Sequence, residues 1–365
     1  MTKTNVCTKS SELVSILNTQ FQGKINLARI KLISHFVIAL CKVQTVTFEK
    51  LANSFDSSST ADSSLRRIQR FIATYYFDSD LVARLIFSLI PDNKTVRITM
   101  DRTNWKFGKL DINIFMLGVV YQGVAFPLLF KMLPKRGNSN TNERIELVNR
   151  FINLFGKETI ESIVADREFV GKNWINYLNE NDLKYYIRIR NNFKVFNFDK
   201  NKETPAFWLF NDLKVNQFRY CSKIVSINGE LCYLSGMKLP RSGKKQEFLI
   251  IVSFTKPEKA QEYYKQRWQI EMCFKAMKTS GFNIEKTHLT DIDRIEKLVL
   301  LIMIAFVWSY KIGIYLHTKI KEIPIKTHGR KAKSIFKHGL NFLNKFFLSS
   351  EKELLINVFG FLSCT

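Results

Sequence analysis

Hydrophobic positions recur with a helical period over residues 26–76. Val46 and Thr47 are placed to staple and cap a short helix over Phe48–Phe55. A linker of turn-forming and capping residues, 56–60, then leads into a second helix. The two predicted helices resemble a helix-turn-helix.

The second of these helices has two unlike faces. Leu65, Ile68 and Ile72 recur at i, i+3 and i+7 on an inward face. Three arginines lie on the opposite face: Arg66, Arg67 and Arg70. A basic helix of this kind can lie in a DNA groove, and it can equally be an ordinary solvated face. The pattern alone leaves both interpretations open.

From residue 95 the pattern changes to short apolar runs rich in β-branched and aromatic residues. They predict three strands, with the first ending at Asp101 and a hairpin turn at Gln122-Gly123. A helix over Glu143–Phe155, a strand ending at Asp166, a further helix and a further strand follow. The expected order is β-β-β-α-β-α-β.

The segment after residue 190 carries short strand-like runs, among them 218–227, and a second hairpin signal at Asn228-Gly229. One more strand follows, and Pro257 then opens a long helix predicted to run to about Gly281. We therefore expect an α/β protein divided into five regions. These are a helical DNA-binding region 1–94 with the helix-turn-helix at 46–76, a first core part 95–190, a β-rich insertion 191–246, a second core part 247–310, and a basic helical region 311–365.

Composition narrows the class of protein. Of the 365 residues 46% are hydrophobic, and Gly and Pro number only 15 and 7, which excludes a disordered or collagen-like chain. Lysine and arginine total 56 against 32 acidic residues, for a net charge of +24. This excess favours a polyanionic partner, with nucleic acid ahead of an anionic membrane.

The sequence gives little support for a membrane protein or for a metal site built from cysteines. The apolar run 298–308 is shorter than the roughly 20 residues of a membrane span and predicts a buried helix. The first 20 residues lack a secretory signal pattern, so we expect a cytoplasmic protein without a membrane partner. The six cysteines, from Cys7 to Cys364, form no CxxC pair and are expected to be reduced.

Asp101 and Asp166 each follow a predicted strand. The carboxyl ends of strands in an α/β sheet open into a crevice, where a metal-dependent site can be built. An Asp-Arg pair after a strand is also a common way to start a turn. Neither aspartate identifies a site when it is considered alone.

The predicted long helix carries a third carboxylate in a polar stripe. Tyr264, Arg267, Glu271 and Lys278 lie at offsets 0, 3, 7 and 14, within about 60° of one another around a regular helix axis. An adjoining apolar stripe can pack on the sheet. A solvated polar face is the ordinary alternative, but a glutamate flanked by cations suits a carboxylate held near phosphate.

Together these residues resemble a known family. Tyr264-x2-Arg267-x3-Glu271-x6-Lys278 has the spacing of the signature of the IS4-family insertion-sequence transposases. Asp101-Arg-Thr and Asp166-Arg-Glu resemble the contexts of that family's first two catalytic aspartates. The resemblance covers about residues 95–290.

The resemblance implies an RNase H-like core in which Asp101, Asp166 and Glu271 are catalytic and bind two Mg²⁺ ions, for which Mn²⁺ can substitute. Independently, three ionised carboxylates in a crevice would repel one another, and hard cations with oxygen ligands relieve that repulsion. Two such ions can activate a water or a DNA 3′-hydroxyl and stabilise the leaving oxygen. DNA hydrolysis and strand transfer can therefore share one site.

By similarity, Tyr264, Arg267 and Lys278 would hold the DNA backbone near the reacting end. The family acts as a synaptic homodimer on double-stranded DNA, at transposon ends and at target DNA. Some members stack a flipped base on an aromatic residue. Trp208 and Trp268 lie near the corresponding region, and the alternative for each is packing in the core.

The sequence thus predicts a cut-and-paste DNA transposase that binds the terminal inverted repeats of its insertion sequence. Two alternatives remain: a catalytically inactive, transposase-derived DNA-binding protein, and a divalent-metal-dependent DNA nuclease without strand transfer. Retention of all three carboxylates and the complete helix stripe argues against the first alternative. Strand-transfer products would exclude the second.

Overall fold

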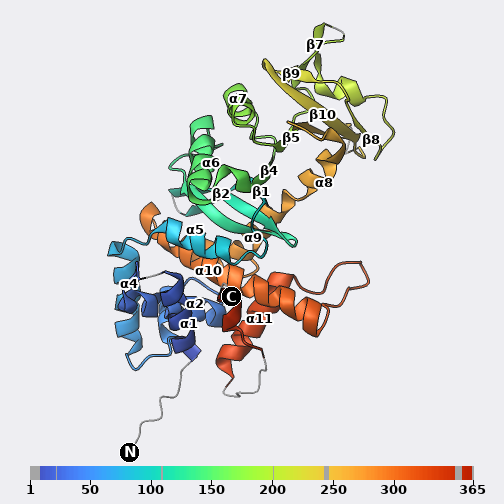
Figure 1. Cartoon of the computed structure of the whole chain (residues 1–365). Coiled ribbons are helices and arrows are strands. Elements are labelled where there is room, and N and C mark those ends of the chain that lie inside the picture. The colour runs from blue at the N-terminus through green and yellow to red at the C-terminus, as the bar shows by residue number, and fades with distance from the viewer. Residues whose placement is uncertain are drawn as a thin grey trace, which may run out of the picture. The chain divides into compact units, whose positions relative to one another are not determined.

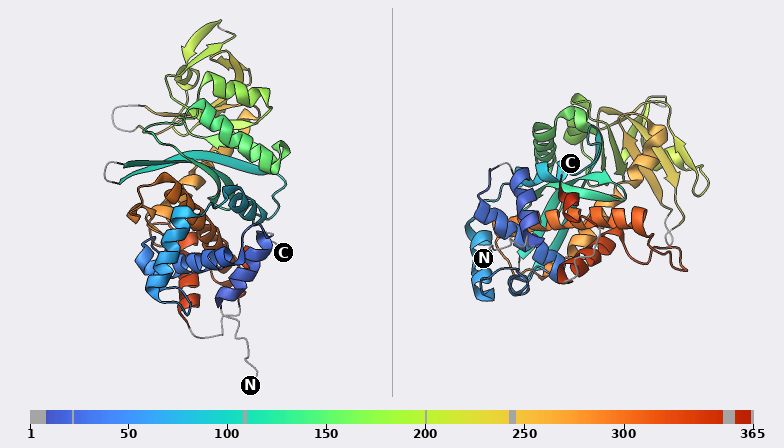
Figure 2. Two further views of the ribbon diagram at one scale, coloured as in Figure 1. Left: turned by 90° about the vertical axis from the view of Figure 1, so that its left-hand side faces the viewer. Right: turned by 60° about the horizontal axis from the view of Figure 1, so that its bottom comes forward.

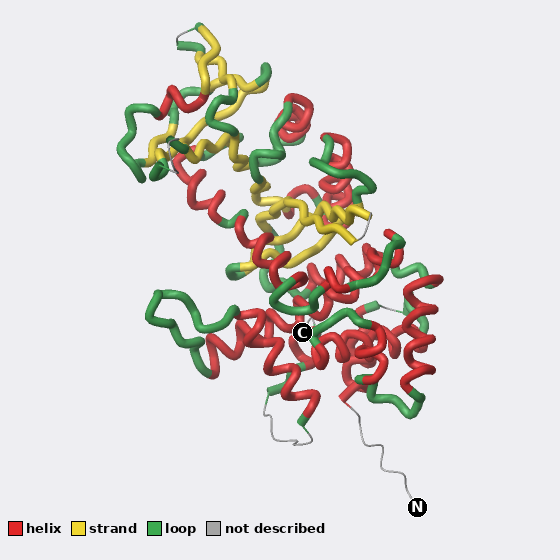
Figure 3. Tube along the Cα trace, turned by 180° about the vertical axis from the view of Figure 1, so that it is seen from behind, coloured by secondary structure: helices red, strands yellow, loops and turns green. Residues whose placement is uncertain are grey.

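The computed structural model of the chain describes residues 9–21, 23–107, 110–199, 201–241, 246–349 and 356–363. Cys7 and Cys364 lie outside these residues. The chain forms two compact units. The helical unit comprises Met1–Pro91, Trp105–Ile112 and Cys273–Thr365, and the sheet unit comprises Asp92–Asn104 and Asn113–Met272. Helices make up most of the first unit, and the strands lie mainly in the second (Figure 3).

The helical unit joins segments from both ends of the chain. Helices α2 and α10 pack together, as do α2 and α11, and the blue and orange-red segments lie side by side in both views of Figure 2. The helices of this unit, apart from the end of α9, are α1 (Lys9–Gln20), α2 (Leu27–Val43), α3 (Phe48–Asn53), α4 (Ala61–Thr74), α5 (Ser79–Ser88), α10 (Ile292–Tyr315) and α11 (Ile335–Leu348).

Helix α10 is the centre of this unit. The segment Ile292–Ile320 is long and apolar enough to cross a membrane, but 83% of its most apolar window is buried inside the protein. Trp308 is completely buried, and its indole N–H donates to the Val358 carbonyl at 2.8 Å. The apolar run 298–308 therefore belongs to a buried core helix, as predicted.

The two predicted helices at residues 46–76 are present as α3 and α4. Thr60 caps α4 by accepting from the Ser63 N–H at 3.3 Å. Thr47 occupies the N-cap position of α3 without a side-chain capping bond, because its hydroxyl contacts the Thr45 hydroxyl at 3.2 Å. On α4, Arg66 and Arg70 are exposed and Arg67 is half-buried.

Within the described residues, the strands of the sheet unit form a mixed sheet whose first five strands run in the order β3-β2-β1-β4-β5 (Figure 1). Strands β1, β4 and β5 are parallel, and β2 and β3 form an antiparallel hairpin. This is the strand order of an RNase H-like core, which confirms the predicted fold class. The strands are β1 (Val96–Phe107), β2 (Leu110–Tyr121), β3 (Val124–Met132), β4 (Ile160–Ala165), β5 (Tyr185–Ile189) and β11 (Phe248–Ser253).

Helices cover both faces of this core. Strand residues alternate between faces, and the Tyr185 hydroxyl donates to Asn179 of α7 (Lys172–Glu180) at 3.2 Å. Tyr186 points the other way and packs with Val164, Ile251 and α8 (Ala260–Lys265). Helix α6 (Thr141–Phe155) packs against β3. The α8 face of the sheet is the one that matters for the candidate site.

The β-rich insertion extends the sheet beyond β11. Its strands are β6 (Lys194–Asn197), β7 (Lys202–Pro205), β8 (Phe218–Tyr220), β9 (Val225–Ile227) and β10 (Glu230–Lys238). The prediction of one strand over 218–227 is wrong. Strands β8 and β9 pair with different parts of β10, so the chain leaves the ladder between Tyr220 and Val225.

The long helix predicted from Pro257 to about Gly281 is also interrupted. It consists of a 3-10 turn, Pro257–Lys259, then α8, and then α9 (Trp268–Lys278). At the junction the backbone N–H groups of Gln266 and Arg267 bond three residues back rather than four. The tighter turn accompanies the inward contacts of the Gln266 and Arg267 side chains, and it alters the regular helical spacing used in the prediction.

Candidate active site

Asp101 and Asp166 lie on neighbouring parallel strands. Met100 of β1 pairs with Ala165 of β4, so the two aspartates follow the last paired positions. Strand alternation places them on the face that carries Thr99 and Val164, toward α8. Strand β1 does not end at Asp101 as predicted but continues along β2 to Phe107. Asp101 therefore lies where β4 separates from β1, which opens the sheet edge at this point.

Tyr264 and Arg267 contact these aspartates. The Tyr264 hydroxyl donates to Asp166 Oδ1 at 3.2 Å. The Arg267 guanidinium donates to Asp101 Oδ2 at 3.3 Å and to Glu271 Oε1 at 2.5 Å. Arg267 is 4% exposed, and its Nε has no hydrogen-bond partner within the described part of the chain. Arg267 thus brings the carboxylates of Asp101 and Glu271 together.

The surroundings of Asp101 favour its neutral form. Burial raises the pKa of Asp101 from 3.8 to about 6, although the Arg102 backbone N–H and the Arg267 charge oppose the shift. The charges of Glu168 and Glu271 add to the increase. Burial and the Asp166 charge also raise the pKa of Tyr264. Tyr264 therefore remains a hydrogen-bond donor over the physiological pH range.

The Asp101 shift predicts a pH-dependent stability in EDTA. Between pH 4 and 6 the folded chain holds more protons than the unfolded chain, so the free energy of unfolding falls as pH rises, by up to about 3 kcal/mol. Urea unfolding of wild type and Asp101→Asn at several pH values measures this. The variant should lack this part of the pH dependence, and an unchanged slope would contradict the assigned protonation.

The donor set suits a divalent metal by its chemistry. Asp101, Asp166 and Glu271 offer carboxylate oxygens, the ligands that Mg²⁺ and Mn²⁺ prefer. Within the described residues, no three His, Cys, Asp or Glu side chains are close enough to hold an ion as they stand. The Arg267 guanidinium bonds two of the three carboxylates. The set fits a metal in chemistry and location, and rearrangement of Arg267 would have to accompany binding.

A second ion pair braces the two aspartate-bearing segments, and the sequence did not indicate its partners. Arg102, next to Asp101, donates to both oxygens of Glu168 at 2.8 Å. It also donates to Asn113 and Asn138, at 3.2 and 2.8 Å. The recurrence of arginine after each aspartate was the available signal for Arg102.

Loss of this pair should destabilise the sheet unit. The Arg102 and Glu168 side chains are only 13% and 18% exposed, so Arg102→Met leaves a largely buried carboxylate unpaired, at a cost of about 2 to 3 kcal/mol. A double-mutant cycle with Glu168→Gln, followed by urea unfolding, should give a coupling above about 1 kcal/mol. The exposed pair Lys131–Glu146 is the control, with coupling expected below about 1 kcal/mol. Equal coupling in both pairs would contradict the bracing role.

Two further arginines on the α8 side were also missed. Arg97 is buried and donates to Ser162 and Gln266 at 2.8 and 2.6 Å. It also lies 3.9 Å from the centre of the Tyr263 ring. Arg97 therefore anchors the α8–α9 junction to β1 and β4. Arg188 of β5 is close enough to Tyr264 to influence its ionisation.

The remaining predicted residues have other surroundings. Lys278 belongs to the helical unit, where its ammonium bonds Glu285 at 2.9 Å and lies 5.3 Å from the centre of the Trp105 ring. Trp208 and Trp268 are 59% and 60% exposed, so packing in the core is wrong for both. Lys278 thus belongs to a different compact unit from the three carboxylates.

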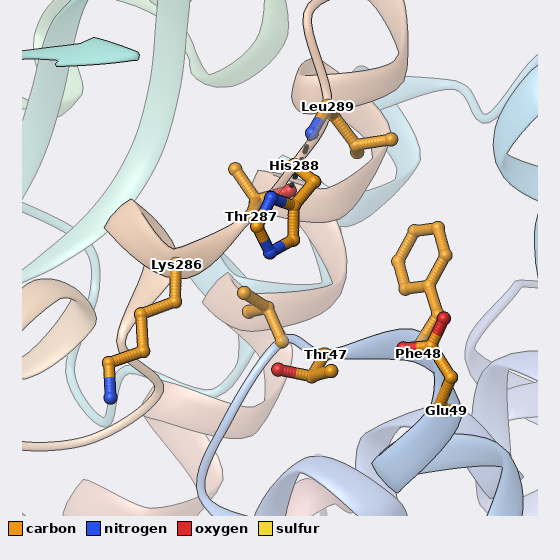
Figure 4. A pocket seen from close by; sticks show the side chains of 8 residues that line it. Thr47, Phe48, Glu49, Lys286, Thr287, His288 and Leu289 are labelled. Carbon is orange, nitrogen blue, oxygen red and sulfur yellow. Dashed lines mark hydrogen bonds between the residues drawn. The ribbon is translucent and has the colours of Figure 1, made fainter. Parts of the chain in front are cut away.

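A pocket of about 120 Å³ lies within the helical unit (Figure 4). The beginning of α3 forms one side, and residues 286–289 form the other. The Thr287 hydroxyl accepts from the Leu289 N–H at 3.3 Å. None of the predicted site residues lines this pocket. It is separate from the carboxylate site in its residues and in its compact unit.

One comparison with known proteins identifies a family. A family model described as the transposase DDE domain matches residues 92–308. Among curated proteins, none matches the chain. A solved structure of piggyBac transposase, a synaptic complex with hairpin DNA, is 13% identical with a TM-score of 0.44. That alignment covers 93% of this chain and 77% of the other chain. The family match spans every predicted catalytic residue.

Proposed function

Because the chain belongs to the family of proteins with a transposase DDE domain, we propose that it catalyses cut-and-paste transposition of its own insertion sequence. It would bind the terminal inverted repeats, cut the DNA next to them and join the cut ends to target DNA. The specific IS4 assignment is part of this proposal and rests on the spacing from Tyr264 to Lys278.

One observation supports the catalytic assignment above others. Asp101 and Asp166 share one face of two adjacent parallel strands, and Arg267, at the junction of α8 and α9, links Asp101 to Glu271 on that face. Three carboxylates separated by 65 and 105 positions in the sequence thus converge on one sheet edge. We assign these three residues as the catalytic and metal-binding groups.

The chain's own groups have distinct roles in this proposal. Two divalent ions, when bound, activate the attacking oxygen and stabilise the leaving oxygen of the phosphoryl transfer. Asp101, Asp166 and Glu271 would hold them. Arg267 would turn its guanidinium from the carboxylates toward a DNA phosphate, which it can bind through two parallel hydrogen bonds. Tyr264 would donate its hydroxyl next to Asp166.

Other surfaces would bind DNA outside the reacting phosphate. We assign Arg66, Arg67 and Arg70 on α4 to contacts with the repeat, and Lys278 to the DNA backbone. Phosphate contacts position the duplex, whereas base contacts specify sequence. The protein would act as a homodimer that holds two DNA ends in a synaptic complex, in the cytoplasm.

The direct test uses purified protein and duplexes that carry the element's terminal repeats with flanking DNA. The proposal predicts nicking next to the repeat in Mg²⁺ or Mn²⁺ and strand-transfer products when target DNA is added. Specific binding without cleavage would instead favour the inactive DNA-binding alternative. Cleavage without joined products would favour the nuclease alternative.

A further inference from the structure

We propose that residues 318–333, here called the basic hairpin, form a second DNA-binding surface that contacts the sugar-phosphate backbone of duplex DNA. This inference rests on the proposed function and adds a surface to it. The segment connects the end of α10 to α11 in the helical unit, and Figure 1 shows it as an orange-red loop beside α11.

The basic hairpin has a defined backbone of its own. Ile325 and Lys331 form an antiparallel bridge, and the Lys326 and Ala332 N–H groups donate across it at 2.8 and 2.7 Å. The turn passes through Gly329, whose φ of +77° favours glycine. Residues 324–332 therefore form a short hairpin that is closed by one bridge and two backbone hydrogen bonds.

Its base is fixed to the end of the preceding helix. Ile323 is 3% exposed, and its N–H donates to His317 Nδ1 at 2.9 Å. The other ring nitrogen of His317 lies 2.7 Å from the Lys331 ammonium. Ile323 and His317 hold the basic hairpin at its base. The residues from 324 to 333 are all exposed.

The exposed part of the basic hairpin is strongly cationic. Every residue from Thr318 to Lys333 except Ile323 is exposed. Six of these residues are basic and Glu322 is the one acid among them: the basic residues are Lys319, Lys321, Lys326, Arg330, Lys331 and Lys333. Closely spaced like charges repel one another, so this composition is best satisfied by a polyanion.

The shape and composition of the basic hairpin favour duplex DNA among polyanions. A short hairpin of two chain segments is narrow enough to enter a DNA groove, where lysine and arginine reach phosphates on either side. Binding to a membrane surface would call for aromatic or leucine side chains on one face, and the basic hairpin contains none. The exposed apolar side chains are those of Ile320 and Ile325.

A salt titration of DNA binding tests the surface. One variant of the basic hairpin, called the arm variant, replaces Lys326, Arg330 and Lys333 by glutamine. It keeps Lys331 and the contact of its ammonium with His317, so the base of the hairpin is unchanged. With full-length protein and a duplex of unrelated sequence, the slope of log affinity against log salt should become shallower by about 2 to 3. The affinity at 0.1 M salt should fall at least about tenfold, because each lost phosphate contact removes about one released counterion.

The control variant removes the same charge elsewhere. Lys94, Lys157 and Lys184 are exposed and precede β1, β4 and β5, at the sheet edge opposite the aspartates. Their glutamine variants should leave the slope within about 1 of wild type. Equal changes in the two variants would show a general charge effect and would overturn the proposal.

A photo-crosslink tests the same surface without removing charge. With p-benzoylphenylalanine at Thr327, in the turn, irradiation should join the full-length protein to the duplex, and excess unlabelled duplex should suppress the product. The absence of DNA adducts from a protein that binds and cuts DNA would overturn the basic hairpin assignment and leave the proposed function intact. Wild-type protein that neither binds nor cuts DNA would overturn both.

Binding to vesicles of phosphatidylserine and phosphatidylcholine tests whether the basic hairpin binds a membrane instead of DNA. The proposal expects no difference in vesicle binding between wild type and the arm variant. Loss of vesicle binding in the arm variant, together with an unchanged DNA salt slope, would assign the surface to a membrane and contradict the proposal.

Discussion

The Glu271→Gln variant is expected to lose at least about 10³-fold in DNA cleavage rate, or about 4 kcal/mol of transition-state stabilisation. Glutamine keeps the size of the side chain and an oxygen that can accept from Arg267, which now bonds Glu271 at 2.5 Å. It lacks the negative charge that a bound divalent ion requires. Single-turnover cleavage of a labelled repeat-end duplex in Mg²⁺ measures the loss.

Glu262→Gln is the matched control for this prediction. Glu262 is an exposed residue of α8, nine positions before Glu271. Its variant should cleave within about twofold of wild type, and both variants should bind the duplex with wild-type affinity. Cleavage by Glu271→Gln near the wild-type rate would remove Glu271 from the site.

The Gly339→Ala variant is expected to lower the free energy of unfolding by about 3 kcal/mol. Gly339 lies in α11, and a Cβ atom there would be 1.8 Å from the Ser309 carbonyl oxygen and 2.6 Å from the Gly313 backbone nitrogen of α10. Alanine favours a helix by about 1 kcal/mol over glycine. A clash with the backbone of a buried helix outweighs that gain, so urea unfolding should show a clear loss.

Gly171→Ala is the control for this prediction. Gly171 has an extended φ of 170°, and no atom lies within 4 Å of an added Cβ. Its free energy of unfolding should stay within about 0.5 kcal/mol of wild type. A Gly339→Ala variant as stable as the Gly171→Ala variant would contradict the close contact of α10 and α11.

Much of the core could be predicted from the sequence because local signals agree with the fold. Gln122 and Gly123 both have positive φ, 43° and 92°, as a tight hairpin turn requires. Short apolar runs rich in β-branched and aromatic residues marked β1, β4 and β5 as strands. The capping residue Thr60 marked the start of α4. These features depend on neighbouring residues alone.

Features that depend on distant residues could not be predicted in the same way. The break between α8 and α9 accompanies contacts of Gln266 and Arg267 with Arg97 and Asp101, which lie more than 160 positions away. The Arg102–Glu168 pair likewise joins segments 66 positions apart. The spacing of Tyr264, Arg267 and Glu271 nevertheless identified residues that reach one site, although the helix that carries them is not regular.

Whether these carboxylates hold catalytic metal ions is tested by the Asp166→Cys variant. A thiolate binds Mg²⁺ poorly and accepts softer Mn²⁺ more readily. Cleavage of the repeat-end duplex is measured for wild type and variant in each metal. The variant is expected to be inactive in Mg²⁺ and to regain cleavage in Mn²⁺. Wild-type cleavage by this variant in Mg²⁺ would contradict this expectation.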